Sequence, residues 1–228
     1  MNNTVTKEGK RMEIGGKTVL FLGDSITEGH GTSGTDKTFC SIIARKYNAH
    51  CVNYGIGGTR IARQSKSSEE PRWDRDFCSR VSEMQSDANA VVVFGGTNDF
   101  GHGDAPIGSM DDRTPETFYG ALHTLYSSLI EKYPGIPIVV ITPLHRTNEN
   151  NSRGDGYKAA TGPLTLYVKI IREVAEYYSL PVLDLFAVSG LQPNVPVIRE
   201  RYVPDGLHPN DAGHMILAEK IGKFLESL

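Results

Sequence analysis

The sequence contains few cysteines and no long apolar segment, and both scarcities narrow its class. Three of the 228 residues are cysteines, Cys40, Cys51 and Cys78, and no two of them form a C-x-x-C pair. An odd number of cysteines without close spacing argues against a disulfide framework and favours reduced thiols. No apolar run is long enough to span a bilayer. We therefore expect neither a disulfide-rich module nor an integral membrane protein.

The N-terminal residues also lack an apolar segment. Residues 1–16 are polar and charged, whereas a secretory leader carries an apolar region at this place. We expect 1–16 to be a polar N-terminal extension and 17–228 to form one domain. The same observation predicts a cytoplasmic protein for the chain as written, and a secreted one if a native leader is missing from it.

Neither sign of charge dominates the sequence. The formal net charge is −3 and charged residues make up 22% of the chain. Basic residues such as Arg60, Arg63, Arg72 and Arg75 are scattered, so no strongly basic surface for nucleic acid or anionic lipid is indicated. We expect a small-molecule or carbohydrate partner and no nucleic acid, and the sequence leaves the oligomeric state open.

Signatures of common cofactor enzymes are absent or out of context. The chain contains neither G-x-x-x-x-G-K-[ST] nor H-E-x-x-H. Residues 29–34 read GHGTSG and fit the dinucleotide pattern G-x-G-x-x-G, but six residues separate them from the preceding apolar run. No acidic strand end follows at the expected spacing either. We therefore expect no cofactor.

A metal site is the other alternative, near the C-terminus. Its candidate ligands are Asp205, His208, Asp211 and His214. Asn210 or Asp211 fits better as the cap of the last helix, with His214 on the surface of that helix. We expect no metal.

Short apolar runs alternate with longer amphipathic segments. The apolar runs predict five strands, at 18–22, 50–54, 90–94, 137–142 and 181–185. Helical spacing predicts helices at 38–48, 115–133, 162–178 and 211–228, and a short helical stretch at 81–84. This alternation predicts an α/β fold, in which helices cover both faces of a mainly parallel five-stranded sheet.

A serine follows the first expected strand, in the run Gly23-Asp24-Ser25-Ile26-Thr27. A serine at a strand end can point its hydroxyl out of the sheet. A helix that begins there would add donor groups where a reaction develops negative charge. The alternative is that Asp24 or Ser25 only caps a helix.

A carboxylate and an imidazole lie three positions apart near the other end of the chain, in Asp205-Gly206-Leu207-His208-Pro209-Asn210. In a turn, Asp205 can accept a proton from one ring nitrogen of His208. The other nitrogen is then available as a base for the Ser25 hydroxyl. Triads are recognised by geometry and role, not by order in the chain. Ser25, His208 and Asp205 are therefore the candidate nucleophile, base and orienting carboxylate.

Two further strand ends carry groups that suit an oxyanion. The strand at 90–94 runs into Gly95-Gly96-Thr97-Asn98-Asp99, where the Asn98 amide can be directed at developing negative charge. The strand at 50–54 runs into a turn that contains Gly55, Gly57 and Gly58, and glycine lets a backbone N–H approach a substrate closely.

These four blocks, in this order, resemble the SGNH (GDSL-type) hydrolase family. GDSIT is similar to its first block, GGTND to its Gly-x-Asn-Asp block and DGLHPN to its Asp-x-x-His block, and counting from Asn53 favours Gly58 for the glycine block. Ile26 stands where the family's eponymous sequence has Leu. The blocks extend from Gly23 to Asn210 and so cover nearly the whole chain.

The resemblance implies a flavodoxin-like three-layer α/β/α sandwich and a serine esterase without metal or cofactor. Ser25 would attack the acyl carbonyl, His208 would act as general base and then general acid, and Asp205 would orient His208. The backbone N–H groups of Ser25 and Gly58 and the side-chain amide of Asn98 would form the oxyanion hole.

Three long polar connections, at 61–77, 100–114 and 144–161, are expected to shape the pocket. Side chains that we consider for substrate contact are Asp24, Arg60, Trp73, Asp99, His102 and His145. Trp73 fits either a wall against a sugar or core packing. Polar loops favour short acyl groups, acetyl above all, on carbohydrate alcohols. The alternatives are a lysophospholipase or thioesterase, an acyltransferase with the same triad, and a catalytically silent carbohydrate-binding domain.

Overall fold

Five parallel strands form the centre of the computed structural model, which describes residues 12–156 and 161–228. The strands are β1 (Thr18–Gly23), β2 (His50–Gly55), β3 (Ala90–Phe94), β4 (Ile138–Ile141) and β5 (Val182–Leu183). Their order is β2-β1-β3-β4-β5, and every neighbouring pair is parallel. The predicted α/β class with a parallel five-stranded sheet is confirmed.

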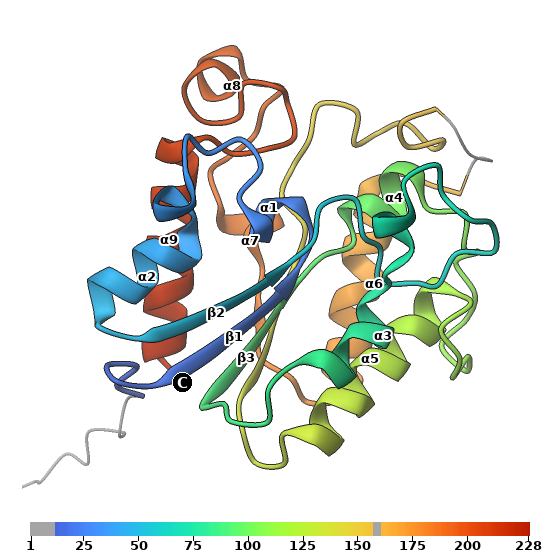
Figure 1. Cartoon of the computed structure of the whole chain (residues 1–228). Helices are drawn as coiled ribbons and strands as arrows, with labels where there is room; N and C mark the ends of the chain where they lie inside the picture. Colours follow the sequence, from blue (N-terminus) through green and yellow to red (C-terminus); the bar gives the residue numbers. More distant parts are fainter. Residues whose placement is uncertain (1–11, 157–160) are drawn as a thin grey trace, which may run out of the picture.

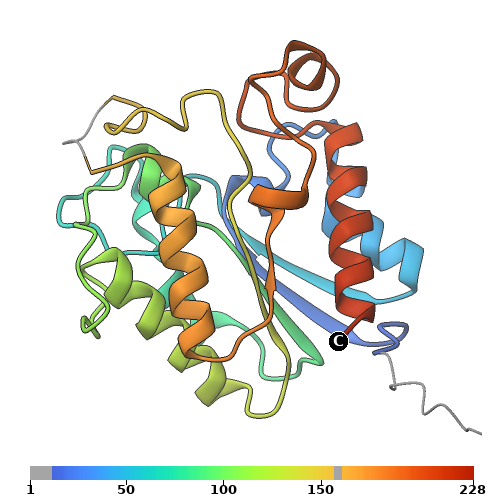
Figure 2. The ribbon, with the colours of Figure 1, turned by 180° about the vertical axis from the view of Figure 1, so that it is seen from behind.

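Helices cover both faces of this sheet (Figures 1 and 2). The helices α2 (Phe39–Tyr47) and α9 (Asp211–Glu226) lie on one face, and α3 (Phe77–Arg80), α5 (Phe118–Lys132) and α6 (Leu164–Tyr177) lie on the other. Side chains of β1 alternate between the two layers: Val19 and Phe21 join the α2–α9 core, and Leu20 and Leu22 join the α5–α6 core. This is the three-layer sandwich that the resemblance implied.

Side-chain caps set the beginnings of α2, α5 and α9, whereas α6 begins after Pro163 without one. Thr38 accepts from the Ser41 N–H before α2, and Asn210 accepts from the Gly213 N–H before α9. Thr117 does the same for α5, so the helix predicted from residue 115 begins three residues later and Pro115 lies outside it. No helix among the described residues is both long and apolar enough to cross a membrane.

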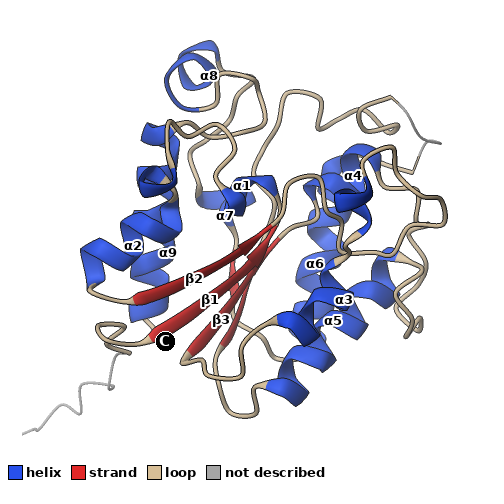
Figure 3. Ribbon diagram, in the orientation of Figure 1, coloured by secondary structure: helices blue, strands red, loops and turns tan. Residues whose placement is uncertain are grey.

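Several short helices were not predicted (Figure 3). They are α1 (Ser25–Glu28), α3, α4 (Thr97–His102), α7 (Leu185–Val188) and α8 (Pro196–Tyr202), together with the 3₁₀ turns η1 (Thr35–Lys37) and η2 (Pro71–Asp74). The predicted helical stretch at 81–84 is the 3₁₀ turn η3 (Val81–Glu83). One or two turns offer too few positions for helical periodicity to be recognised.

The predicted polar extension lies partly outside the described residues, at 1–11. Its last residues contact the domain, because the side chain of Ile14 is fully buried in the α2–α9 core. In addition, the Gly16 N–H donates to the Asn48 carbonyl at 2.7 Å. The described part of the predicted extension therefore packs with the sheet.

The carboxyl ends of β1 and β3 lie side by side in this strand order. The chain leaves β1 toward α2 on one face and leaves β3 toward α5 on the other face (Figure 1). Such a point of divergence opens a crevice at the sheet edge, where open α/β folds bind their ligands. Ser25 follows β1 and Asn98 follows β3 at this edge.

Candidate active site

A tight turn places Ser25 directly after β1. A Cβ on Gly23 would lie 2.0 Å from Thr27 Oγ1 and 3.0 Å from the Phe94 carbonyl oxygen, so only glycine fits there. The Asp24 side chain accepts from the Ile26 N–H at 3.0 Å and caps α1. Because α1 has only four residues, its dipole is small. The turn therefore supports Ser25 mainly through backbone N–H donors, and the electric field of the helix contributes less.

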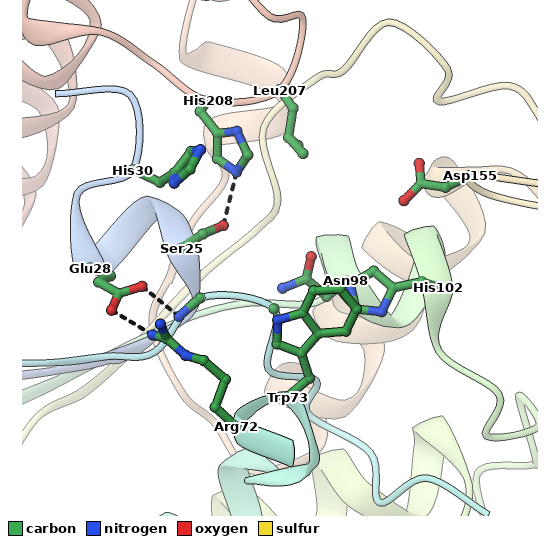
Figure 4. A pocket seen from close by; sticks show the side chains of 12 residues that line it. Ser25, Glu28, His30, Arg72, Trp73, Asn98, His102, Asp155, Leu207 and His208 are labelled. Carbon is green, nitrogen blue, oxygen red and sulfur yellow. Dashed lines mark hydrogen bonds and ion pairs between the residues drawn. The ribbon is translucent and has the colours of Figure 1, made fainter. Parts of the chain in front are cut away.

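Ser25, His208 and Asp205 form one hydrogen-bonded line. Ser25 Oγ lies 3.0 Å from His208 Nε2 (Figure 4), and His208 Nδ1 lies 2.6 Å from Asp205 Oδ2. Since a carboxylate only accepts, the proton on the ring belongs on Nδ1, and Nε2 is left to accept from the serine hydroxyl. This line can carry a proton from Ser25 to His208.

Asp205 is held in its ionised form. Partial burial raises its pKa, but hydrogen bonds from the His208 ring and from the backbone N–H groups of His208 and Leu207 outweigh burial and hold the pKa well below its usual value. The two backbone bonds are 2.7 and 2.8 Å long and both end on Oδ1. A negative charge therefore remains beside the imidazole at neutral pH.

Contacts between the two loops bring Ser25 within reach of His208, although 183 positions separate them. A Cβ on Gly31 would lie 2.6 Å from the Pro209 carbonyl oxygen, so the glycine turn packs directly on the histidine loop. The Ser33 N–H and hydroxyl both donate to the Asp211 carboxylate, at 2.8 and 2.6 Å. Gly31 of the GHGTSG run thus allows this close approach of the two loops.

Gly58 and Asn98 face the same cavity as Ser25. Gly58 has φ +78°, and a Cβ there would lie 2.1 Å from the Trp73 indole. The Asn98 side chain is buried, and its Nδ2 donates one proton to the Thr59 carbonyl at 3.0 Å. An amide nitrogen carries two protons, so a second N–H of Asn98 remains for a ligand.

The cavity above Ser25 has a volume of about 300 Å³ (Figure 4). Twelve residues line it: Ser25, Glu28, His30, Gly57, Gly58, Arg72, Trp73, Asn98, His102, Asp155, Leu207 and His208. Leu207 and Trp73 supply its aliphatic and indole surface, and charged, polar and glycine residues supply the rest. The cavity wall is therefore a mixture of polar and apolar surface.

Trp73 and His102, two of the side chains considered for substrate contact, line the cavity, and their ring centres lie 5.0 Å apart. Asp24 and Asp99 do not line it. Asp24 is buried beneath α1 as its cap. The two carboxylate oxygens of Asp99 accept from the backbone N–H groups of Ile61 and Ala62, both at 2.9 Å.

Arg60 and His145 also lie outside the lining. Arg60 is buried and donates to His102 Nδ1 at 3.1 Å and to Asp74 at 3.0 Å, so it holds a lining residue from behind. His145 bonds Glu149 at 2.7 Å, and its ring lies 3.8 Å from that of Phe186. Both of these side chains are thus hydrogen-bonded within the protein.

Sequence reasoning missed much of the cavity wall. Glu28 Oε2 accepts from the Gly57 N–H at 2.7 Å, and its Oε1 accepts from Arg72 at 2.6 Å. The His30 ring lies 4.3 Å from that of His208. Glu28 and His30 lie within five residues of Ser25, a closeness that could have singled them out. Asp155 lies in a long loop and had no such signal.

One group of side chains could reach a metal ion. His30, Asp205 and His208 present ligand atoms that all lie within 4.8 Å of one another. Asp205 and His208 already bond each other, so a metal would compete with the Ser25–His208–Asp205 line instead of completing it. His214 belongs to no such group among the described residues. It is buried against Phe39, whose N–H it accepts, and the prediction of a surface position was wrong.

Comparison with known proteins identifies the family and the fold of this chain. The GDSL-like lipase/acylhydrolase family matches residues 21–216. A GDSL lipase of Mycobacterium tuberculosis is 25% identical over 219 residues, which cover 91% of this chain and 80% of that protein. A solved structure from Lactobacillus plantarum is 30% identical with a TM-score of 0.80, covering 94% of this chain and 98% of that one. The lipase/acylhydrolase from Enterococcus faecalis, at 20% identity and a TM-score of 0.62 over 92% and 95%, shares the fold.

The chain therefore belongs to the GDSL-like lipase/acylhydrolase family. It is a serine hydrolase that acts on ester bonds, as the sequence blocks indicated.

Proposed function

We propose that this protein is a short-chain carboxylic esterase that works through an acyl-enzyme on Ser25, with acetyl esters of sugar-like alcohols as its preferred substrates. The observation that carries the proposal is the line Ser25 Oγ–His208 Nε2–Asp205, with contacts of 3.0 and 2.6 Å. A hydroxyl bonded to an imidazole that a carboxylate orients is the arrangement of an activated serine.

In the first half of the reaction, Ser25 Oγ attacks the carbonyl carbon as its proton moves to His208 Nε2. The carbonyl electron pair moves to the oxygen and gives a tetrahedral oxyanion. His208 then returns the proton to the alcohol oxygen, the bond to that alcohol breaks, and an acyl ester remains on Ser25. Asp205 stabilises the imidazolium throughout and keeps the ring in its orientation.

In the second half, water takes the place of the alcohol. His208 accepts a proton from the water, whose oxygen attacks the acyl carbon, and the proton then passes to Ser25 Oγ as the acid leaves. The oxyanion donors in both halves are the Ser25 N–H, the Gly58 N–H and the free N–H of Asn98. Each donor is worth about 3 kcal/mol of transition-state stabilisation.

The cavity supports a short acyl group and a polar alcohol. Its volume of about 300 Å³ lies at the lower end of the range for ligand pockets. Glu28, Arg72 and His30 line it with hydrogen-bonding groups that suit a polyhydroxylated alcohol. Trp73 adds an aromatic face against which a sugar ring can pack.

The test is hydrolysis of p-nitrophenyl esters from acetate to palmitate by wild type, Ser25→Ala and the control Ser82→Ala, which replaces an exposed serine of η3. We expect rates that are highest with acetate, unchanged in Ser82→Ala, and lowered about 10⁴-fold or more in Ser25→Ala. A maximum at long chains would overturn the substrate class and favour lysophospholipids or thioesters. Equal rates in wild type and Ser25→Ala would overturn the mechanism and favour a silent binding domain.

A further inference from the structure

A buried arginine lies behind the groups proposed to bind the oxyanion. Arg80 is the last residue of α3, is 3% exposed, and packs its guanidinium 4.6 Å from the centre of the Phe77 ring. Among the described residues it forms no ion pair within 4.0 Å. Burying a cation without a carboxylate partner destabilises the folded state, so other interactions of Arg80 must offset this cost.

The guanidinium bonds three segments that meet at the site. Nη1 donates to the Tyr54 carbonyl at the end of β2, at 2.7 Å. Nη2 donates to the Gly23 carbonyl at 3.1 Å and to Thr59 Oγ1 at 3.0 Å. Gly23 lies two residues before Ser25, and Thr59 directly follows Gly58. One planar fork therefore fixes the spacing between the segments that carry two of the proposed oxyanion donors.

Thr59 extends this connection to the third donor. Its carbonyl oxygen accepts from Asn98 Nδ2 at 3.0 Å, and its hydroxyl donates to the Ile56 carbonyl at 2.7 Å. The path from Gly23 through Arg80 and Thr59 to Asn98 thus joins all three groups. Loss of the Arg80 side chain would free the turn at Gly58 to move relative to Ser25.

The charge of Arg80 adds to this effect. Burial, and then the nearby charge of Arg75, lower its pKa to about 10, so it stays ionised at neutral pH. The buried Asp24 carboxylate attracts it without contact. A fixed positive charge behind the oxyanion donors favours the negative charge that develops there, and it needs no rearrangement during the reaction.

We propose that Arg80 is the positioning residue of the oxyanion hole: it locks the backbone before Ser25 to the backbone after Gly58 and stabilises the oxyanion through these groups without touching the substrate. This inference rests on the proposed function of Ser25, Gly58 and Asn98.

The test compares Arg80→Met, Arg80→Lys and the control Arg75→Met in p-nitrophenyl acetate hydrolysis. Arg75 precedes α3, is half-exposed and pairs with Glu83, so its loss removes a nearby charge outside the site. We expect Arg80→Met to lower kcat about 100-fold with little change in KM, because a misplaced hole weakens only the transition state. Arg80→Lys keeps the charge but not the fork, and an intermediate loss of about 10-fold is expected. Arg75→Met is expected to match wild type.

A boronic acid separates this role from general support of the fold. Phenylboronic acid forms a tetrahedral adduct on a reactive serine and places an oxygen in the oxyanion hole. Its affinity is expected to fall in step with kcat/KM across the Arg80 variants. Wild-type kcat in a folded Arg80→Lys and Arg80→Met would overturn the proposal, as would lost kcat with unchanged boronate affinity. If Arg80→Met does not fold, Arg80→Lys decides alone. Equal activity of wild type and Ser25→Ala would instead overturn the proposed function itself.

Discussion

Among the individual residues, Asp24 has a pKa on which burial and local hydrogen bonding act in opposite directions. Burial raises the pKa of Asp24 to about 6, although the Ile26 N–H and the charges of His208 and Arg80 lower it. Asp24 as a whole is 2% exposed. Asp24 therefore supports the turn that presents Ser25, and its buried charge lowers the stability of the folded protein to an extent that depends on pH.

Asp24→Asn tests this cost. Since the folded-state pKa lies above the usual value, the folded protein binds the proton more tightly than the unfolded chain. Wild type therefore loses stability as the pH rises through the window from about 4 to about 6. Asparagine keeps the cap oxygen without the charge. We expect Asp24→Asn to match wild type at pH 4 and to be more stable by about 2 kcal/mol at pH 8.

Thermal unfolding at the two pH values measures this difference. The control is Asp111→Asn, which neutralises an exposed carboxylate and should shift both values little. A stability difference for Asp24→Asn that is the same at pH 4 and pH 8 would show that the Asp24 charge is not destabilised by burial.

At the scale of elements, the turn from Gly57 to Thr59 is held in place by four side chains. Glu28 accepts the Gly57 N–H, the Trp73 indole covers Gly58, and Arg80 and Asn98 both bond Thr59. All four partners come from segments distant in sequence. The position of the Gly58 N–H is therefore set by tertiary contacts and not by the turn sequence alone.

Gly58→Ala is expected to displace this turn. The new methyl would meet the Trp73 indole at 2.1 Å, and φ +78° disfavours alanine as well. Gly135→Ala is the matched control, because Gly135 has φ +76° with nothing within 4 Å of a Cβ. Both variants should lose about 1 kcal/mol of stability or more from backbone strain.

The expected difference between the two variants lies in activity. Only Gly58→Ala should lower kcat, by about 10-fold or more, and only it should change the emission of Trp73, the single tryptophan of the chain. Steady-state kinetics and fluorescence measure both effects. An active Gly58→Ala with unchanged emission would show that the turn does not supply an oxyanion donor.

The elements also show how far the sequence could be interpreted. The strands and the residues at their ends were predictable because short apolar runs and glycine turns are local signals. The cavity wall was not, since Arg72 and Asp155 reach the site through long loops whose course depends on tertiary contacts. His145 and Asp99 were considered for substrate contact because they are polar and follow strands. Backbone N–H groups of the loop after β2 hold Asp99 elsewhere, a contact that no local pattern reveals, and Glu149 of its own loop holds His145.

At the scale of the whole molecule, the order β2-β1-β3-β4-β5 brings the site together. Ser25 leaves one central strand, Asn98 leaves its neighbour, and His208 arrives on the loop before α9, which packs on α2. Ser25 and His208 meet only when the first and last parts of the chain have packed on the same face of the sheet. The hydrogen-bonded line at the site thus depends on the complete fold.

Covalent labelling with diisopropyl fluorophosphate, followed by peptide mapping by mass spectrometry, determines whether Ser25 is the nucleophile. The reagent transfers its phosphoryl group to an activated serine with loss of fluoride. We expect one adduct, on Ser25, with loss of ester hydrolysis in proportion to labelling, and no labelling of His208→Ala. Full activity with Ser25 modified, or inactivation with the adduct on another residue, would contradict the account.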